Sequence, residues 1–100
     1  MKNLYTPPPS SLENEFVEAL YEKGNVRIEH IVSDGHSSPE GFWYDQSRNE
    51  WVCVLKGRAR ITFEDGDKEL GEGDHMLIPA GKRHRVACTS RQCHWLAVFA

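Results

Sequence analysis

The feature that most constrains this chain is a change of hydrophobic period near Gly24. Beyond that residue apolar and polar side chains alternate, which is the period of a half-buried strand and not of a helix. The alternation runs in short segments separated by glycine-containing or polar turns, so the chain is expected to be all-β, as a sandwich or barrel. Strands are predicted over residues 26–31, 51–55, 59–63, 68–70, 75–78, 84–88 and 93–99.

The residues before Gly24 follow a different pattern. Residues 1–9 end in three consecutive prolines and are expected to form an extended, Pro-rich arm. A capping-box pair and an apolar stripe of helical spacing come next, which predicts one short amphipathic helix over residues 10–23. The box consists of Ser10 and Glu13, and the stripe of Leu12, Phe16 and Leu20.

Size and charge limit the classes of function. A chain of 100 residues with 39% hydrophobic residues has room for one core, so residues 10–100 are expected to form a single domain. The net charge of -3 disfavours nucleic acid as a partner. No apolar run could span a bilayer, and the N-terminus lacks the apolar core of a signal peptide. Since the three cysteines form no CxxC pair either, we expect a cytoplasmic protein with reduced thiols that binds neither membrane nor nucleic acid.

Two glycine-containing patterns identify a family. One is a glycine, five residues, Pro-x-Gly, two residues and a histidine; the other, earlier in the chain, is a glutamate, six residues and a glycine. Their fixed residues are Gly73, Pro79, Gly81 and His84 in the first, and Glu50 and Gly57 in the second. Together they resemble the two motifs of small single-domain cupins over residues 26–99. The resemblance implies an antiparallel double-stranded β-helix, or jelly-roll barrel, and a homodimer.

The structure expected around the first pattern explains why these residue types stand at its fixed positions. Pro79 and Gly81 favour a turn between two strands, so that His84 begins the return strand with its ring toward the interior. If Glu50 also faces inward, the two side chains can meet. We therefore predict Glu50 and His84 as the catalytic residues of an internal site.

The resemblance also raises the question of a metal. Metal-binding cupins usually present a His-x-His pair shortly before the glutamate, and this chain has none. A divalent ion (Fe, Mn, Ni or Zn) could still use Asp45, Glu50 and His84, since carboxylate and imidazole suit such ions. The alternative is that Glu50 and His84 form a buried hydrogen-bonded pair that fixes the strand register, with no metal cofactor. The sequence leaves both open.

Aromatic residues gather where the family's ligand-bearing strand should run. We predict Trp43, Tyr44 and Gln46 as substrate-binding residues, because aromatic walls with a few polar tips are typical of small-molecule pockets. The alternative is that Phe42 and Trp43 fill the barrel or a dimer contact.

These features predict a cupin that binds a small-molecule ligand inside its barrel. The first hypothesis is an enzyme, such as an oxygenase or isomerase, that applies metal-assisted or acid/base chemistry to a small polar substrate. The alternative is a non-catalytic binding or sensing module that has lost its metal site. For the homodimer, the expected contacts are the arm at 7–9 and the apolar face with Trp51 and Leu55.

Overall fold

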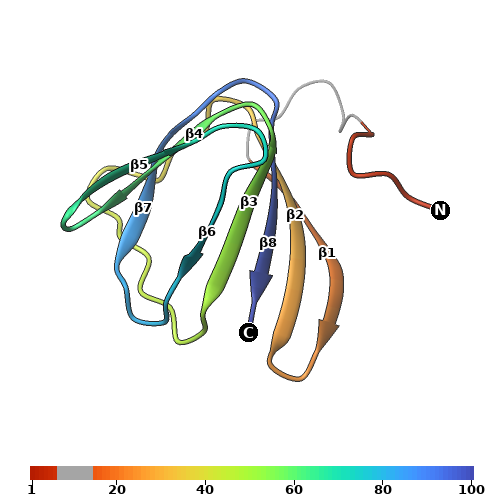
Figure 1. Cartoon of the computed structure of the whole chain (residues 1–100), viewed down its shortest axis with the longest axis horizontal. Helices are drawn as coiled ribbons and strands as arrows, with labels where there is room; N and C mark the ends of the chain where they lie inside the picture. Colours follow the sequence, from red (N-terminus) through yellow and green to blue (C-terminus); the bar gives the residue numbers. More distant parts are fainter. Residues whose placement is uncertain (7–14) are drawn as a thin grey trace.

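The computed structural model of the chain describes residues 1–6 and 15–100. Its secondary structure consists of strands, which form two antiparallel sheets. Strands β1 to β8 span Phe16–Lys23, Val26–Ser33, Glu50–Lys56, Ala59–Phe63, Gly66–Leu70, His75–Ile78, His84–Thr89 and Cys93–Phe99. One sheet has five strands in the order β1-β2-β8-β3-β6, and the other has three in the order β5-β4-β7 (Figure 1). The prediction of an all-β, antiparallel fold is confirmed, and the strands predicted from residue 26 onward all form.

The two sheets do not close into a barrel. Among the described residues, the strand ladders join neighbours within each sheet, and no ladder joins β1 or β6 to a strand of the smaller sheet. The prediction of a closed jelly-roll barrel is therefore wrong on this point. Alternation of side chains indicates which face of a strand is buried, but it does not indicate which strand edges pair.

The predicted helix over residues 10–23 is also wrong where it can be compared with the structure. Residues 16–23 form β1, whereas residues 10–14 lie outside the described part. β1 makes a hairpin with β2 through Gly24, whose φ of 58° suits a tight turn. An irregularity in the register between Ala19 and Tyr21 breaks the strict alternation of β1, and for this reason its sequence resembles a helical stripe. No helix in the described chain is long and apolar enough to cross a membrane.

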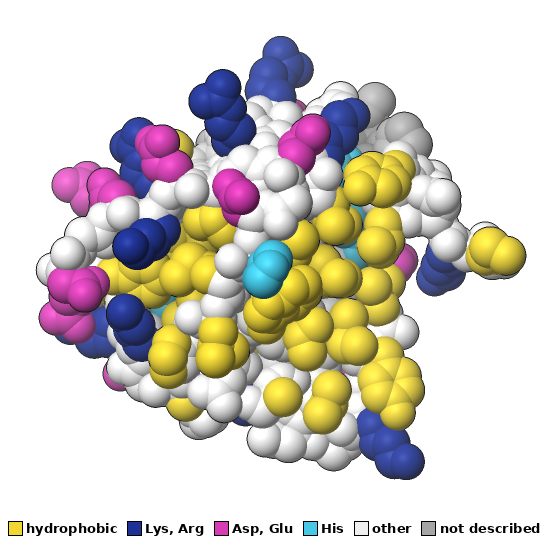
Figure 2. All heavy atoms as spheres, in the orientation of Figure 1, with side chains coloured by type: hydrophobic (Ala, Val, Ile, Leu, Met, Phe, Trp, Pro, Cys, Tyr) yellow, Lys and Arg dark blue, Asp and Glu magenta, His cyan; other side chains and the backbone are white. Residues whose placement is uncertain are grey.

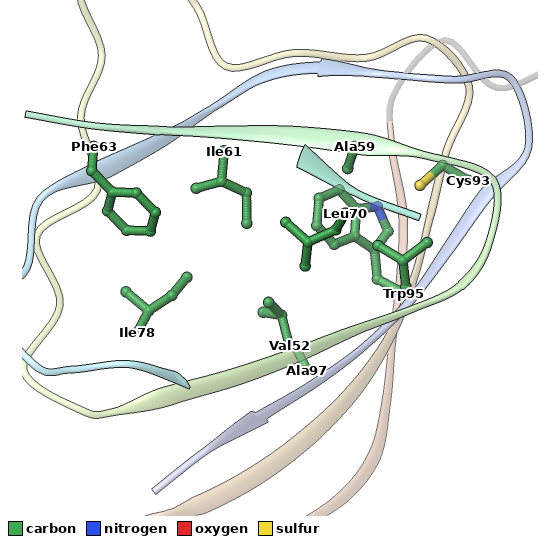
Figure 3. Packing of buried hydrophobic residues seen from close by; sticks show 10 residues of the cluster. Val52, Ala59, Ile61, Phe63, Leu70, Ile78, Cys93, Trp95 and Ala97 are labelled. Atoms are coloured by element: carbon green, nitrogen blue, oxygen red, sulfur yellow. The ribbon is translucent and has the colours of Figure 1, made fainter. Parts of the chain in front are cut away.

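The hydrophobic core lies between the two sheets. Figure 3 shows Ile61 and Phe63 of β4 opposite Val52 of β3 and Ile78 of β6. The other buried members of this cluster are Val54, Ala59, Leu70, Cys93, Trp95 and Ala97. As the alternation predicts, Glu50 and the buried valines of β3 share the inward face.

The motif glycine Gly57 occupies a position that no other residue fits well. Its φ is 90°, and a Cβ added there would lie 2.5 Å from Ser90 Oγ and 3.1 Å from Cys93 Cα. The turn after β3 therefore packs directly against the turn before β8. Ser90 fixes this contact, because its hydroxyl accepts a hydrogen bond from the Arg58 N–H at 2.9 Å and its own N–H donates to the Arg58 carbonyl at 2.9 Å.

A pair of buried histidines lies on the side of the large sheet away from the core. His30 of β2 and His94 of β8 stack at 5.2 Å between ring centroids, with 3.1 Å between His30 Nε2 and His94 Nδ1. Burial and the neighbouring His94 lower the pKa of His30, against the opposing charge of Glu18. Burial also lowers the pKa of His94, although a hydrogen bond to the backbone of Leu4 opposes this shift.

This pair predicts a pH-dependent stability. Since the folded protein resists protonation of both rings, the unfolded chain binds more protons between the lowered pKa values and about 6.5. The free energy of unfolding should therefore rise with pH through that window and fall as the pH drops below about 6.5. Urea unfolding at a series of pH values measures the slope. His30→Gln should flatten it, whereas the same change at the exposed His75 should not; an equal slope in all three proteins would contradict the assignment.

Candidate functional site

A cavity of about 310 Å³ lies between the sheets. Its walls are mostly apolar and come from both sheets. The apolar lining consists of Val17, Ile31, Val52, Ile61, Ile78, Val86, Trp95 and Phe99, and the polar lining of Glu15, Glu29, Tyr44, Gln46, Glu50 and His84. A mostly apolar cavity with a few converging polar groups is the usual form of a small-molecule site.

The motif turn brings Glu50 and His84 together. Ile78, the last residue of β6, pairs with Glu50 in the large sheet, and the turn that follows crosses to the small sheet, where His84 begins β7. Gly81 supports the turn with a φ of 79°. Glu50 Oε1 lies 3.5 Å from His84 Nε2, and both residues are buried. The predicted convergence of these two side chains inside the protein is therefore found.

The hydrogen bonds of His84 determine which of its nitrogens faces the cavity. His84 Nδ1 lies 3.0 Å from the carbonyl of Lys82, and because a carbonyl only accepts, Nδ1 carries a proton. Nε2 is left to exchange a proton with Glu50. Burial lowers the pKa of His84, but the hydrogen bond to Glu50, the bond to the Lys82 carbonyl and the charge of Glu50 together outweigh it, so the pKa is raised above its ordinary value.

Gln46 completes the polar end of the cavity. Its side-chain amide donates to Glu50 Oε1 at 2.8 Å and lies 3.4 Å from His84 Nε2. The same motif turn holds Gln46 in place, because the Gly81 N–H donates to the Gln46 carbonyl at 2.8 Å. The predicted residue Gln46 therefore contacts both members of the pair.

Tyr44 covers the histidine ring. It forms a backbone bridge with His84, with N to O distances of 2.7 and 3.1 Å, and the two rings stack at 5.4 Å. Burial and the negative charges of Glu15 and Glu50 raise the pKa of the Tyr44 phenol, against a hydrogen bond with Ser38. The phenol is therefore protonated near neutral pH and can act as a hydrogen-bond donor.

Two of the predicted site residues do not join the cavity. Trp43 and Asp45 are absent from its lining, and the guanidinium of Arg83 lies 5.4 Å from the centre of the Trp43 ring. Asp45 is exposed between the inward-facing Tyr44 and Gln46, as alternation in an extended segment requires.

Two polar residues of the lining, Glu15 and Glu29, are not among the predicted site residues. Glu15 lies in the segment that was predicted to be a helix. Glu29 lies in a correctly predicted strand and shares a face with Ile31, so the alternation alone could have placed it beside an apolar cavity residue.

Comparison with known proteins identifies the family. The model of the cupin domain matches residues 28–99, which is most of the chain. This protein is a cupin. No curated protein matches it.

Solved structures agree with this assignment. A candidate mannose-6-phosphate isomerase from Ralstonia eutropha is 38% identical, with a TM-score of 0.95 over 100% of this chain and 96% of that one. A cupin superfamily protein from Desulfitobacterium hafniense is 22% identical, with a TM-score of 0.79 over 92% of this chain and 82% of that one. KdgF from Halomonas sp. is 13% identical, with a TM-score of 0.75 over 88% and 81%. The last two show the fold alone.

Cupins often bind divalent metals, and the donor atoms around Glu50 and His84 determine whether this cavity could hold one. Among residues 1–6 and 15–100, no group of three or more His, Cys, Asp or Glu side chains could hold a metal ion. Glu50 and His84 offer one carboxylate and one imidazole, and the third neighbour, Gln46, directs an N–H at the carboxylate. This donor set does not fit a transition metal, which prefers more nitrogen or charged oxygen ligands.

The donor set predicts how metal affinity should respond to substitution. Wild-type protein dialysed against Zn²⁺ or Ni²⁺ should retain much less than one equivalent, whereas Gln46→His adds a second imidazole on the cavity side and should gain binding. Elemental analysis and the shift in unfolding temperature measure both effects. Asp45→His, one residue away on the outward side, is the matched control and should gain nothing. One tightly held ion per wild-type chain would contradict this account of the site.

Proposed function

We propose that this cupin is a small-molecule enzyme in which Glu50 and His84 transfer protons without a metal. The observation that supports the proposal is the carboxylate–imidazole pair, with 3.5 Å between the closest atoms, at the wall of an otherwise mostly apolar cavity. Pairs of this kind in a mostly apolar cavity are suited to general acid–base catalysis, because one group can give a proton while the other takes one.

The reaction that fits the pair is the isomerisation of a small carbonyl compound with a neighbouring hydroxyl group. The Glu50 carboxylate takes a proton from the carbon next to the carbonyl, and protonated His84 gives its Nε2 proton to the carbonyl oxygen. The product of this step is an enediol. The reverse transfers at the neighbouring carbon and oxygen return both protons and leave the two residues in their starting states. Tyr44, as a protonated phenol, supplies a hydrogen bond to the developing oxygen charge.

Two further observations bear on this proposal. The relative from Ralstonia eutropha carries the name of a candidate isomerase, and aldose–ketose isomerisation is a proton-transfer reaction of this class. Gln46 fixes the carboxylate of Glu50 with a 2.8 Å hydrogen bond, which keeps the proposed base in one orientation. The second candidate function, non-catalytic binding or sensing, uses the same cavity and predicts stoichiometric binding without proton exchange.

Deuterium exchange tests the catalytic proposal without knowledge of the physiological substrate. In D2O, the wild-type protein should catalyse exchange at the carbon next to the carbonyl in some members of a panel of small hydroxyketones, followed by proton NMR. Glu50→Gln and His84→Gln should each reduce the rate by roughly 10²–10⁴-fold, the usual contribution of a general acid or base. Glu64→Gln, an exposed change of the same charge, should leave the rate unaltered. Exchange that survives both site substitutions would rule out the proposed chemistry.

We further propose that the cupin is a homodimer through the outer face of the five-stranded sheet. Trp51 pairs with Leu77 of β6 and Val98 of β8, and Cys53 pairs with Leu96, so these side chains share one surface. Leu77 is 57% exposed. Figure 2 shows hydrophobic side chains gathered over β3, β8 and β2, and a second copy of the same apolar face is the simplest partner for such a surface.

Light scattering measures the proposed dimer directly. At micromolar concentration the mass should be twice the 11.4 kDa of one chain. Leu77→Lys places a charge in the proposed contact and should give a monomer, whereas Cys88→Lys, at an exposed position of β7, should leave the dimer intact. A wild-type monomer would remove the proposal.

A further inference from the structure

The charge of the cavity lining limits the ligands that it can accept. Its lining contains three carboxylates, from Glu15, Glu29 and Glu50, and no Lys or Arg among the described residues. Residues 7–14, which lie outside the described part, contain no Lys, Arg or His in their sequence. The chain therefore offers no basic side chain there that could hold an anionic group, a role that Arg and Lys usually fill.

The basic group nearest to these carboxylates is already engaged outside the cavity. Arg27 donates from Nε to Glu29 at 2.5 Å and from Nη1 to Glu22 at 2.7 Å, so two carboxylates share its charge. Among the described residues that line the cavity, only His84 can carry positive charge, and Glu50 lies 3.5 Å from it. A phosphate entering the cavity would meet more carboxylates than cationic groups, together with apolar walls, and both oppose the removal of its water.

The same carboxylates are poor anchors for a cation. Glu29 is bonded to Arg27, Glu50 accepts a hydrogen bond from Gln46, and Glu15 accepts one from the hydroxyl of Ser33. Each carboxylate therefore has a donor within the protein. The remaining surface is apolar, with the rings of Trp95 and Phe99 in its walls.

We propose that the cavity binds an uncharged organic molecule with an apolar body and excludes phosphorylated and carboxylated ones. This inference rests on the proposed function, whose substrate class it narrows. It separates the present chain from an isomerase of sugar phosphates, because the phosphate of such a substrate has no partner in the cavity.

A matched set of small probes tests the inference by binding alone. Benzyl alcohol, benzylamine, benzoate, phenyl phosphate and mannose 6-phosphate are titrated into the full-length protein at pH 7.5. The NMR signal of the Trp95 indole N–H is the reporter, because Trp95 lines the cavity and donates to Ser33 at 3.1 Å. Benzyl alcohol should give a saturable shift, and every charged probe should bind at least tenfold more weakly.

Two variants connect the selectivity to charge. In the double variant Glu15→Gln, Glu29→Gln, phenyl phosphate should gain several-fold in affinity relative to benzyl alcohol. The matched control Glu64→Gln, Glu72→Gln removes the same charge from exposed positions outside the lining and should leave the ratio unchanged. Equal ratios in the two double variants would overturn the electrostatic explanation.

The outcomes separate this inference from the proposed function. If phenyl phosphate, mannose 6-phosphate or benzylamine binds as tightly as benzyl alcohol, the selectivity proposal is wrong while the site remains. If no probe shifts the Trp95 signal, the selectivity proposal is wrong, and deuterium exchange on the hydroxyketone panel then decides the proposed function separately.

Discussion

The site depends on the short connection that carries the chain from one sheet to the other. This turn starts beside Glu50, since Ile78 is the register partner of Glu50, and it ends at His84 in the opposite sheet. Its backbone also binds the loop before β3, because the Gly81 N–H holds the carbonyl of Gln46. One segment therefore positions an acid, an imidazole and the amide between them, while the remaining strands supply the apolar walls.

The proposed chemistry follows from the contrast between this polar end and the rest of the cavity. Burial alone would lower the pKa of His84, yet the hydrogen bonds to Glu50 and to the Lys82 carbonyl reverse the shift. A protonated imidazole beside a carboxylate is a poor site for a cationic metal but a good site for moving protons. The contrast also explains why the ligand is expected to be uncharged: the two charges of the pair already balance each other.

Much of the fold could be predicted from the sequence, because alternation and turn residues are local signals. The strands from residue 26 onward follow from alternation, and the meeting of Glu50 with His84 follows from the turn at Pro79 and Gly81. The strand at 16–23 was missed, because a register irregularity after Ala19 hides its alternation. Alternation separates Asp45 from Tyr44 and Gln46, but which of the two sets faces the cavity depends on the pairing of Tyr44 with His84 of β7, and such long-range pairing leaves no local pattern.

The gap between β1 and the three-stranded sheet affects how a molecule could reach the interior. Along this seam no ladder joins the sheets in the described chain, and Val17 at the free edge lines the cavity. A small molecule that enters there would break no ladder between the described strands. Separation of the described strands along this seam would therefore cost little of the global stability. Differences in affinity between ligands would then reflect their dissociation rates more than the rate at which the seam opens.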